Sequence, residues 1–429
     1  MALHKNMGDE MADTLRMRLL AGMLAAVVAA GPPALAKTVD PRASSIVAGD
    51  AAALGFDPAK LDAARQGLKA DVASGKIAGA YLLVGRKGKV VFREGFGVQG
   101  PGQTAAPSDE TIFRIFSMTK PVVSVVAMTL VEDGKLDVDA PVSKYLPEYK
   151  DLVVWQADGT TRPATQPMLV RHLMSHTSGL IYGFIQPQSP IAKAWAAGGE
   201  NRNDLNNREY AKVIAKLPLR TEPGGAWYYS RSTDVLGAVV EVAGGKPLDV
   251  LVRDRVTGPL GMTDTGFVQP AANKARFAEP KAAEPFMYYD YTKQPALLSA
   301  GGGLSSTAED YLRFVLMLAG DGQYKGVRIL KKETLMRMRQ DETTPEMRRA
   351  GLFFPGAGMG FGLGFSLVTD DKLQRPGNGT YSWWGIAGTE FWVDPKNEVF
   401  VIFMVQAREL AMEYQRKNRA WVYDALVKP

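Results

Sequence analysis

The alternation of apolar and polar residues predicts regular elements in the first third of the chain. Apolar residues recur at helical spacing over residues 56–75, which predicts an amphipathic helix. Two β-rich runs, 80–84 and 90–92, flank a glycine-bounded turn at 85–88, a pattern typical of a β-hairpin. The long apolar segment 121–133 predicts a helix that belongs to the core.

The pattern becomes irregular in the middle of the chain and regular again toward its end. Between residues 136 and 295, Pro, Gly and Asn are frequent and apolar periodicity is patchy, so only short helices such as 208–217 are expected. The last third predicts helices at 308–318, 332–340 and 416–427, and strands at 390–394 and 399–404.

These elements predict an α/β fold whose sheet is built from both ends of the chain. A two-stranded hairpin is only marginally stable by itself, so the N-terminal hairpin must meet the C-terminal strands. We therefore expect a sheet domain formed by residues 37–135 and 296–429, with a mostly helical insertion domain at 136–295 between them.

The N-terminus has the features of an export signal. Arg16 and Arg18 precede an apolar stretch at 19–30, and a small-x-small ending follows at 34–36. The apolar stretch is shorter than the ~18–20 residues that a membrane-spanning helix needs. We therefore expect residues 1–36 to be a signal peptide cleaved after Ala36, with no stable membrane insertion. The mature protein is expected in the periplasm or outside the cell.

Composition and charge narrow the possible chemistry. Of the 429 residues, 46% are hydrophobic and 22% charged, the balance of a folded globular protein. The net charge of +6 is spread along the chain without a basic tract interleaved with aromatic residues, so no nucleic-acid partner is expected. The absence of cysteine excludes disulfides and a cysteine nucleophile. Two histidines remain after the export signal, fewer than a zinc site usually needs, and no organic cofactor is implied.

The strongest chemical signal is a serine and a lysine three residues apart at the start of the apolar helix. Ser117 and Lys120 are expected on one side of that helix, one turn apart. Burial lowers the pKa of a lysine, so that its neutral amine can accept the serine proton. Backbone N–H groups at the helix N-terminus would favour negative charge on an acyl oxygen. The alternative is that Ser117 caps the helix and Lys120 lies at the surface.

Two further segments combine tight turns with aromatic residues. Residues 224–230 run from a glycine turn into Tyr229, and residues 381–389 lead into a predicted strand. With the Ser-x-x-Lys tetrad, these motifs resemble the serine β-lactamase and D-alanyl-D-alanine peptidase superfamily. The chain is most similar to class C β-lactamases and to the family VIII carboxylesterases that share their fold. The similarity extends over residues 55–425, nearly all of the expected mature chain.

The resemblance implies a fold and a set of roles. The fold would be β-lactamase-like, with helices flanking an antiparallel sheet and the site in the cleft beside a mostly helical second domain. Ser117 would be the acylated nucleophile, Lys120 would help to deprotonate it, and Tyr229 would pass the proton to the leaving group. The backbone N–H groups of Ser117 and Ile386 would form the oxyanion hole. Residues 301–303 are expected to let the backbone pass close to the site.

The chain departs from the β-lactamase pattern in two motifs. The second motif is usually Tyr-x-Asn, but Arg231 stands at its third position, which removes an amide expected to hold a β-lactam side chain. The third motif, commonly Lys-Thr-Gly in β-lactamases and Trp-Gly-Gly in the esterases, is assigned to Trp383, Trp384 and Gly385. Because this motif lacks a lysine, Trp383 is expected to make the wall apolar, which suits a neutral ester.

The register of the third motif has an alternative. Trp384 stands where the esterases often carry glycine, and a shift by one residue would move the oxyanion donor from Ile386 to Ala387. We prefer the first register because it puts Gly385 where the backbone must approach the substrate closely.

Other residues receive simpler interpretations. His172 and His176 are interpreted as hydrogen-bonding residues, because the chain has no Gly-x-Ser-x-Gly elbow to supply the serine of a Ser-His-Asp triad. Trp227 is close enough to Tyr229 in sequence to line the substrate pocket. Asp234 is interpreted as a helix N-cap.

The sequence therefore predicts an exported serine hydrolase that forms an acyl-enzyme at Ser117, with a carboxylesterase acting on small esters as the favoured activity. A β-lactamase, a D-amino-acid peptidase or a transacylase with the same chemistry is the alternative within the enzyme class. A non-catalytic sensor related to penicillin-binding proteins is the alternative outside it. The expected partner is a small ester, amide or lactam substrate, and the oligomeric state is left open.

Overall fold

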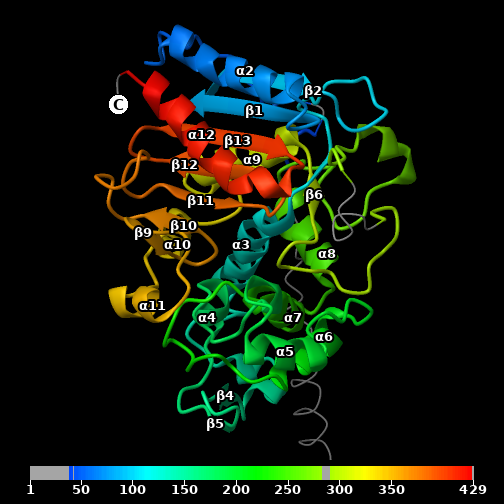
Figure 1. Cartoon of the computed structure of the whole chain (residues 1–429), viewed down its shortest axis with the longest axis vertical. Helices are drawn as coiled ribbons and strands as arrows, with labels where there is room; N and C mark the ends of the chain where they lie inside the picture. Colours follow the sequence, from blue (N-terminus) through cyan, green and yellow to red (C-terminus); the bar gives the residue numbers. More distant parts are fainter. Residues whose placement is uncertain (1–37, 42, 283–289, 428–429) are drawn as a thin grey trace, which may run out of the picture. The chain divides into compact units, whose positions relative to one another are not determined.

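The computed structural model describes residues 38–41, 43–282 and 290–427, and all statements below refer to these (Figure 1). The predicted signal peptide, with its cleavage after Ala36, lies outside them. Within the described ranges, no helix combines the length and the hydrophobicity that a membrane crossing requires.

An antiparallel sheet of seven strands forms the framework, in the order β2-β1-β13-β12-β11-β10-β9 (Figure 1). Its first two strands come from the N-terminal hairpin and the other five from the end of the chain; the hairpin, β12 and β13 were predicted from the sequence. The junction is the pairing of β1 with β13, where Leu83 lies opposite Ile402. The strands are β1 Gly79–Arg86, β2 Lys89–Gly97, β9 Met359–Phe361, β10 Ser366–Val368, β11 Tyr381–Trp384, β12 Glu390–Asp394 and β13 Val399–Val405.

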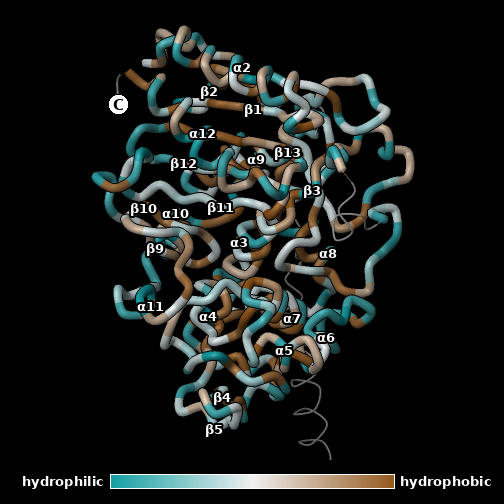
Figure 2. The backbone as a smooth tube through the Cα atoms, viewed as in Figure 1, coloured by the Kyte–Doolittle hydropathy of each residue, from teal (hydrophilic) through white to brown (hydrophobic). Residues whose placement is uncertain are grey.

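Helices cover both faces of this sheet, which explains why its central strands are apolar throughout. Successive residues of a strand point to opposite faces. In β13, Val401 and Phe403 therefore pack toward α2 and α12, whereas Ile402 and Met404 pack toward α9 and the core around α3. Figure 2 shows the resulting contrast between the hydrophobic β1 and the hydrophilic α11. The helices named here are α2 Pro58–Ala73, α3 Thr119–Glu132, α9 Ala308–Ala319, α11 Pro345–Ala350 and α12 Ala411–Ala425.

The middle of the chain is irregular and rich in short helices, as predicted. The predicted helix at 208–217 is α6. The boundaries of a separate insertion domain at 136–295 stay a prediction. The remaining elements are α4 Val170–Met174, α5 Pro190–Ala197, α6 Asn207–Ala215, α7 Ser232–Gly244, α8 Leu248–Val252, α10 Lys332–Met338, and the paired short strands β3 Phe113–Arg114 with β6 Ser305–Ser306, β4 Val153–Trp155 with β5 Thr161–Pro163, and β7 Gln323–Tyr324 with β8 Val327–Arg328.

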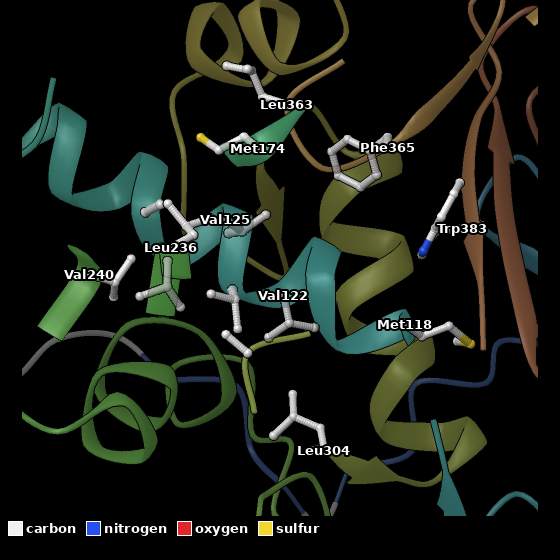
Figure 3. Close-up of a cluster of buried hydrophobic side chains, with 14 of the residues drawn as sticks. Met118, Val122, Val125, Met174, Leu236, Val240, Leu304, Leu363, Phe365 and Trp383 are labelled. Atoms are coloured by element: carbon white, nitrogen blue, oxygen red, sulfur yellow. The ribbon is translucent and has the colours of Figure 1, made fainter. Parts of the chain in front are cut away.

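Helix α3 lies at the centre of the larger core and is buried along nearly its whole length. Figure 3 shows Val122 and Val125 of α3 among side chains of other segments, including Leu236 of α7, Leu304 and Phe365. Close packing on all sides leaves such a helix little freedom to shift. The start of α3 is therefore a rigid platform for the side chains that it carries.

The predicted helix at 416–427 begins earlier in the structure, at Ala411, directly after a 3₁₀ turn at Arg408–Leu410. The first turn of α12 contains the exposed Met412, so the apolar periodicity starts only with the buried Tyr414. Strands β9, β10 and β11 were not predicted, because strands of three or four residues are too short to show an alternating pattern.

Candidate active site

Ser117 lies in a 3₁₀ turn, Phe116–Met118, that leads directly into α3. The sequence predicted Ser117 at the start of the helix, and the structure places it in the 3₁₀ turn just before that helix. Two hydrogen bonds hold this junction, one from the Tyr311 hydroxyl to the carbonyl of Met118 at 3.0 Å and one from the N–H of Leu304 to Thr119 Oγ1 at 3.1 Å.

The residue before the nucleophile candidate has an unusual backbone. Phe116 has φ of 43°, in the left-handed region that side chains other than glycine rarely adopt. Such backbone strain costs about 1–3 kcal/mol and occurs preferentially at functional sites, where surrounding packing maintains it. The strain at Phe116 supports the interpretation of the turn as a functional element.

The Lys120 amine lies beside Ser117 and away from bulk water. Its Nζ is 3.2 Å from Ser117 Oγ, and it donates to the carbonyl of Gly301 at 2.6 Å and to the Tyr182 hydroxyl at 3.2 Å. The side chain of Lys120 is only 2% exposed, and neither helical cap at this junction uses a side-chain hydrogen bond. The alternative with a surface lysine and a capping serine is therefore wrong.

Burial changes the acid–base chemistry of this lysine. Removal from water lowers the pKa of Lys120 from 10.5 to about 7, with Asp234 acting to raise it and Arg231 to lower it. A large fraction of the amine is then neutral at neutral pH. A neutral amine at hydrogen-bond distance can take the proton of Ser117.

Tyr229 faces the same point from the segment before α7. The ring centroid of Tyr229 lies 4.6 Å from Lys120 Nζ, and Trp383 Nε1 donates a hydrogen bond to the Tyr229 hydroxyl at 3.2 Å. Burial raises the pKa of Tyr229 well above its usual value, although hydrogen bonds with Ser117 and Trp383 act in the other direction. Tyr229 is therefore a neutral phenol at neutral pH, able to donate a proton.

A cavity of about 880 Å³ opens over these groups. Ser117, Tyr182 and Tyr229 line it together with a wall that is largely aromatic and aliphatic. The apolar lining residues are Phe116, Phe184, Ile185, Phe354, Trp384, Ile386 and Met412. The volume is in the range that accommodates drug-sized molecules.

Some residues of the third motif and of the turn after it lie at the cavity, and others lie in the core. Trp384 and Ile386 line the cavity, whereas Ala387 is fully buried and packs against Phe116. Gly385 lies tightly packed, because a Cβ there would be 2.5 Å from the carbonyl oxygen of Ile115. Of the two residues considered as oxyanion donors, Ile386 is thus the one at the cavity, and the close approach of Gly385 is to the backbone preceding Ser117.

Replacing Gly385 by alanine is expected to push the turn after β11 away from Ser117. The added methyl group would meet Thr389 Oγ1 at 2.4 Å as well as the Ile115 carbonyl, and neither can retreat easily. A misplacement of about 1 Å in a catalytic site costs ~10²-fold in rate. Measured kcat should fall by about that factor while circular dichroism stays native. A variant with undiminished kcat would contradict the proposed proximity.

Two tryptophans lie deeper than expected. Trp227 is fully buried and Trp383 is 2% exposed, so neither forms the cavity wall. Trp383 is covered by the rings of Tyr229, Phe354 and Phe361, at centroid distances of 5.3, 6.1 and 5.1 Å. The apolar wall expected from Trp383 is provided by Trp384 instead, and the expected substrate contacts of Trp227 and Trp383 find no support in their positions.

The two histidines make the hydrogen bonds expected of structural residues. His172 Nδ1 accepts from the N–H of Leu169 at 3.2 Å, and His176 Nδ1 is 3.2 Å from Ser230 Oγ. Burial holds the pKa of His176 well below its usual range, so this ring is neutral. Its centroid lies 4.7 Å from that of Tyr229, which gives it a packing role beneath the phenol.

Sequence reasoning missed Tyr182 and misassigned Asp234. Arg231 occupies the N-cap position of α7, and Asp234 is the third residue of the helix, so the predicted N-cap is wrong. The Asp234 carboxylate instead accepts from the N–H of Gly301 at 3.0 Å. The expectation that residues 301–303 bring backbone close to the site is confirmed by the bond from Lys120 to Gly301. Tyr182 carries no local sequence signal that it reaches Lys120.

Within the ranges described, no three His, Cys, Asp or Glu side chains gather closely enough to hold a metal ion.

Comparison with known proteins identifies the family. The family model described as Beta-lactamase matches residues 64–425. The chain belongs to the beta-lactamase family. Esterase EstB of Burkholderia gladioli is 32% identical over 387 residues, which are 84% of this chain and 91% of EstB. An uncharacterised protein of Mycobacterium tuberculosis is 37% identical over 367 residues, 81% of this chain and 90% of that protein.

A solved structure agrees with this membership. EstCE1, described as a hydrolase with promiscuous acyltransferase activity, matches with a TM-score of 0.71 and 28% identity, and the match covers 86% of this chain and 99% of EstCE1. The predicted β-lactamase-like fold is confirmed. Family membership and the Ser-Lys-Tyr geometry together make this beta-lactamase family member a serine hydrolase.

Proposed function

We propose that this protein is a carboxylesterase that forms an acyl-enzyme at Ser117 and acts on neutral esters with apolar groups. The observation that carries the proposal is the buried Lys120 amine, 3.2 Å from Ser117 Oγ at the edge of a largely apolar cavity. A serine is a weak nucleophile until a nearby base removes its proton. The neutral form of Lys120 supplies that base.

The reaction follows from the positions of the three groups. Lys120 takes the hydroxyl proton of Ser117 as Oγ bonds to the ester carbonyl carbon. The N–H groups of Ser117 and Ile386 stabilise the resulting oxyanion, each such donor contributing ~3–4 kcal/mol in the transition state. Tyr229 donates its proton to the departing alkoxide and regains one from the ammonium of Lys120. Water then replaces the alcohol, and the same steps in reverse release the acid.

Esters are favoured over lactams by the side chains that surround the site. Arg231, at the position usually held by an amide in the β-lactamase motif, is engaged with Glu200 at 3.3 Å and with Asp234 at 3.6 Å. The wall near Ser117 contains Phe354 and Trp384, which offer an apolar contact to a neutral substrate. Esters larger than the small ones predicted from sequence also fit the cavity volume.

The test combines covalent labelling with a substrate panel. Intact-mass measurement after treatment with a fluorophosphonate should show one adduct, mapped to Ser117 by peptide sequencing. kcat/KM for p-nitrophenyl esters of increasing acyl length should exceed that for nitrocefin and for a D-Ala-D-Ala peptide. A higher kcat/KM for nitrocefin or the peptide would replace the esterase by the lactamase or peptidase alternative. Absence of any adduct would favour a non-catalytic sensor.

Acyl transfer to an alcohol is the second candidate. The cavity of about 880 Å³ has room for an acyl group and an acceptor at the same time. The related EstCE1 is described as a hydrolase with promiscuous acyltransferase activity. With an ester donor and an added primary alcohol, a transferase would yield more of the new ester than of the free acid, as chromatography of the products would reveal.

Replacing Tyr229 by phenylalanine should lower kcat by about 10²- to 10⁴-fold, because the leaving alkoxide loses its proton donor. The ring and its packing against His176 would remain. Trp383→Phe serves as the control, since it removes the hydrogen bond to the phenol and part of the buried indole ring but leaves the Tyr229 proton in place, and it should cost about tenfold or less. Stopped-flow measurement of alcohol release checks both variants. Near-normal release in Tyr229→Phe would exclude this role.

Export is proposed from the N-terminal sequence alone. A basic segment, an apolar stretch and a small-x-small ending together favour cleavage after Ala36. N-terminal sequencing of the protein from a periplasmic or culture fraction should begin at Lys37. Recovery of the uncleaved chain from the cytoplasm would contradict export without bearing on the chemistry.

A further inference from the structure

Two opposite charges lie at the start of α7, behind the Lys120 amine. The side chain of Asp234 has no exposure and that of Arg231 is 18% exposed, and the two are 3.6 Å apart. Removing two charges from water costs free energy that their attraction often does not fully return. A buried ion pair therefore suggests a functional role. None of the steps proposed above uses either residue.

Asp234 reaches Lys120 through a single residue, Gly301. Asp234 Oδ1 accepts hydrogen bonds from the N–H of Gly301 at 3.0 Å and from Ser299 Oγ at 2.7 Å. The carbonyl of the same Gly301 accepts from Lys120 Nζ at 2.6 Å. A Cβ on Gly301 would lie 2.9 Å from both Asp234 Oδ2 and the Tyr182 hydroxyl, so the carboxylate and the phenol enclose this residue tightly. The carboxylate therefore fixes the acceptor that orients the amine.

Arg231 and the Lys120 amine both contact Tyr182. The Arg231 guanidinium lies 4.9 Å from the centroid of the Tyr182 ring, whose hydroxyl is 3.2 Å from Lys120 Nζ. Glu200, which is 2% exposed, holds the guanidinium in place and also accepts from the N–H of Gly183 at 2.9 Å. A permanent positive charge is thus anchored close to an amine that must stay neutral to act as a base.

We propose that Asp234 and Arg231 are positioning residues that set the pH at which Lys120 becomes an active base, Asp234 by holding Gly301 and stabilising the ammonium, Arg231 by opposing it. The inference rests on the proposed function, since it concerns the base that activates Ser117. Opposed charges of this kind allow the working pH of the site to be adjusted without altering the nucleophile.

The other groups that face the amine carry no charge at neutral pH. Tyr182 and Tyr229 are phenols with raised pKa values, and His176 is a neutral imidazole with a lowered pKa. Glu200 faces Arg231. Asp234 raises and Arg231 lowers the pKa of Lys120, after the larger effect of burial. Because the neutral amine is the active form, loss of the aspartate charge should move the acidic limb of the rate profile to lower pH, and loss of the arginine charge to higher pH.

The test is the pH dependence of two rates in Asp234→Asn and Arg231→Met. These are kcat/KM for a p-nitrophenyl ester and the rate of labelling by a fluorophosphonate. Asparagine keeps an acceptor for Gly301 while removing the charge. The acidic limb, near pH 7 in the wild type, is expected to shift down by about one pH unit in Asp234→Asn and up by about one unit in Arg231→Met.

Arg419→Met is the matched control for the loss of a buried ion pair. Arg419 is 20% exposed and lies 2.9 Å from Glu390, which is 2% exposed, so this pair resembles that of Arg231 and Glu200 but lies on α12 and β12. Its removal should lower the melting temperature comparably and leave the acidic limb in place. If the Asp234 and Arg231 variants fold but the acidic limbs of their rate profiles do not shift, or shift in the same direction, the roles proposed for these two residues are wrong and the proposed function stands. If the fluorophosphonate does not label the wild-type protein, both the roles of Asp234 and Arg231 and the proposed function are wrong.

Discussion

Replacing Ser117 by alanine is expected to lower kcat/KM by about 10⁴- to 10⁶-fold and to abolish fluorophosphonate labelling. The hydroxyl is the only part of the site that forms a bond to the acyl group, and no other group in the proposed reaction can take its place. The substitution removes one oxygen from a turn whose backbone is held by Tyr311 and Leu304, so the fold should persist. Steady-state kinetics and intact mass measure the two effects.

Ser124→Ala is the matched control for Ser117→Ala. Ser124 lies on α3, the helix that directly follows the turn of Ser117; its side chain is buried, and its Oγ has no hydrogen-bond partner. Removing an unpaired buried hydroxyl is close to neutral for stability, so activity and labelling should stay at the wild-type level. Activity of Ser117→Ala within tenfold of this control would contradict the acyl-enzyme mechanism.

Replacing Lys120 by methionine is expected to lower kcat/KM by about 10²- to 10⁴-fold, the usual contribution of a positioned general base. Methionine is apolar and suits a site that is closed to water. In the wild type, kcat/KM should rise with pH through about 7, because the amine becomes an acceptor only when it loses its proton. The residual activity of Lys120→Met should lack this limb.

The pH profile separates a chemical role of Lys120 from a structural one. A variant that is merely misfolded loses rate equally at every pH, whereas loss of the base removes the dependence on pH. Lys135→Met, an exposed lysine beyond the end of α3, is the control and should keep the limb near pH 7. Persistence of that limb in Lys120→Met would assign it to another group and contradict the proposed base.

The elements that could be predicted from sequence are those whose packing leaves a pattern along the chain. Helices α2 and α9 each bury one face, so their apolar residues recur at helical spacing. Strand β13 is buried on both faces and is therefore apolar at every position. Strands β9 to β11 lack such a pattern, since a few residues between turns cannot show a period. They became visible only in the sheet.

Part of the candidate site was predicted because it is local or carried by a motif. Ser117 and Lys120 are three residues apart, and helical geometry brings them together in almost any fold. Tyr229 was assigned by resemblance, and the structure brings its ring to 4.6 Å from Lys120 Nζ. Trp383 and Trp227 were expected at the cavity, but other aromatic rings cover them and both lie in the core. A sequence motif does not show which side chains will cover a residue.

By itself the sequence determined the nature of the chemistry: a serine and a lysine one turn apart at the start of an apolar helix, without cysteine and with too few histidines for the common alternatives. Only the tertiary structure decided how the lysine is made basic. Its partners Tyr182 and Gly301 are separated from it by 62 and 181 residues, and their meeting depends on the closure of the whole core. The desolvation of Lys120 and the electrostatic field of the buried charges near it depend on residues that are distant in the sequence. Both therefore exist only after these segments have packed together.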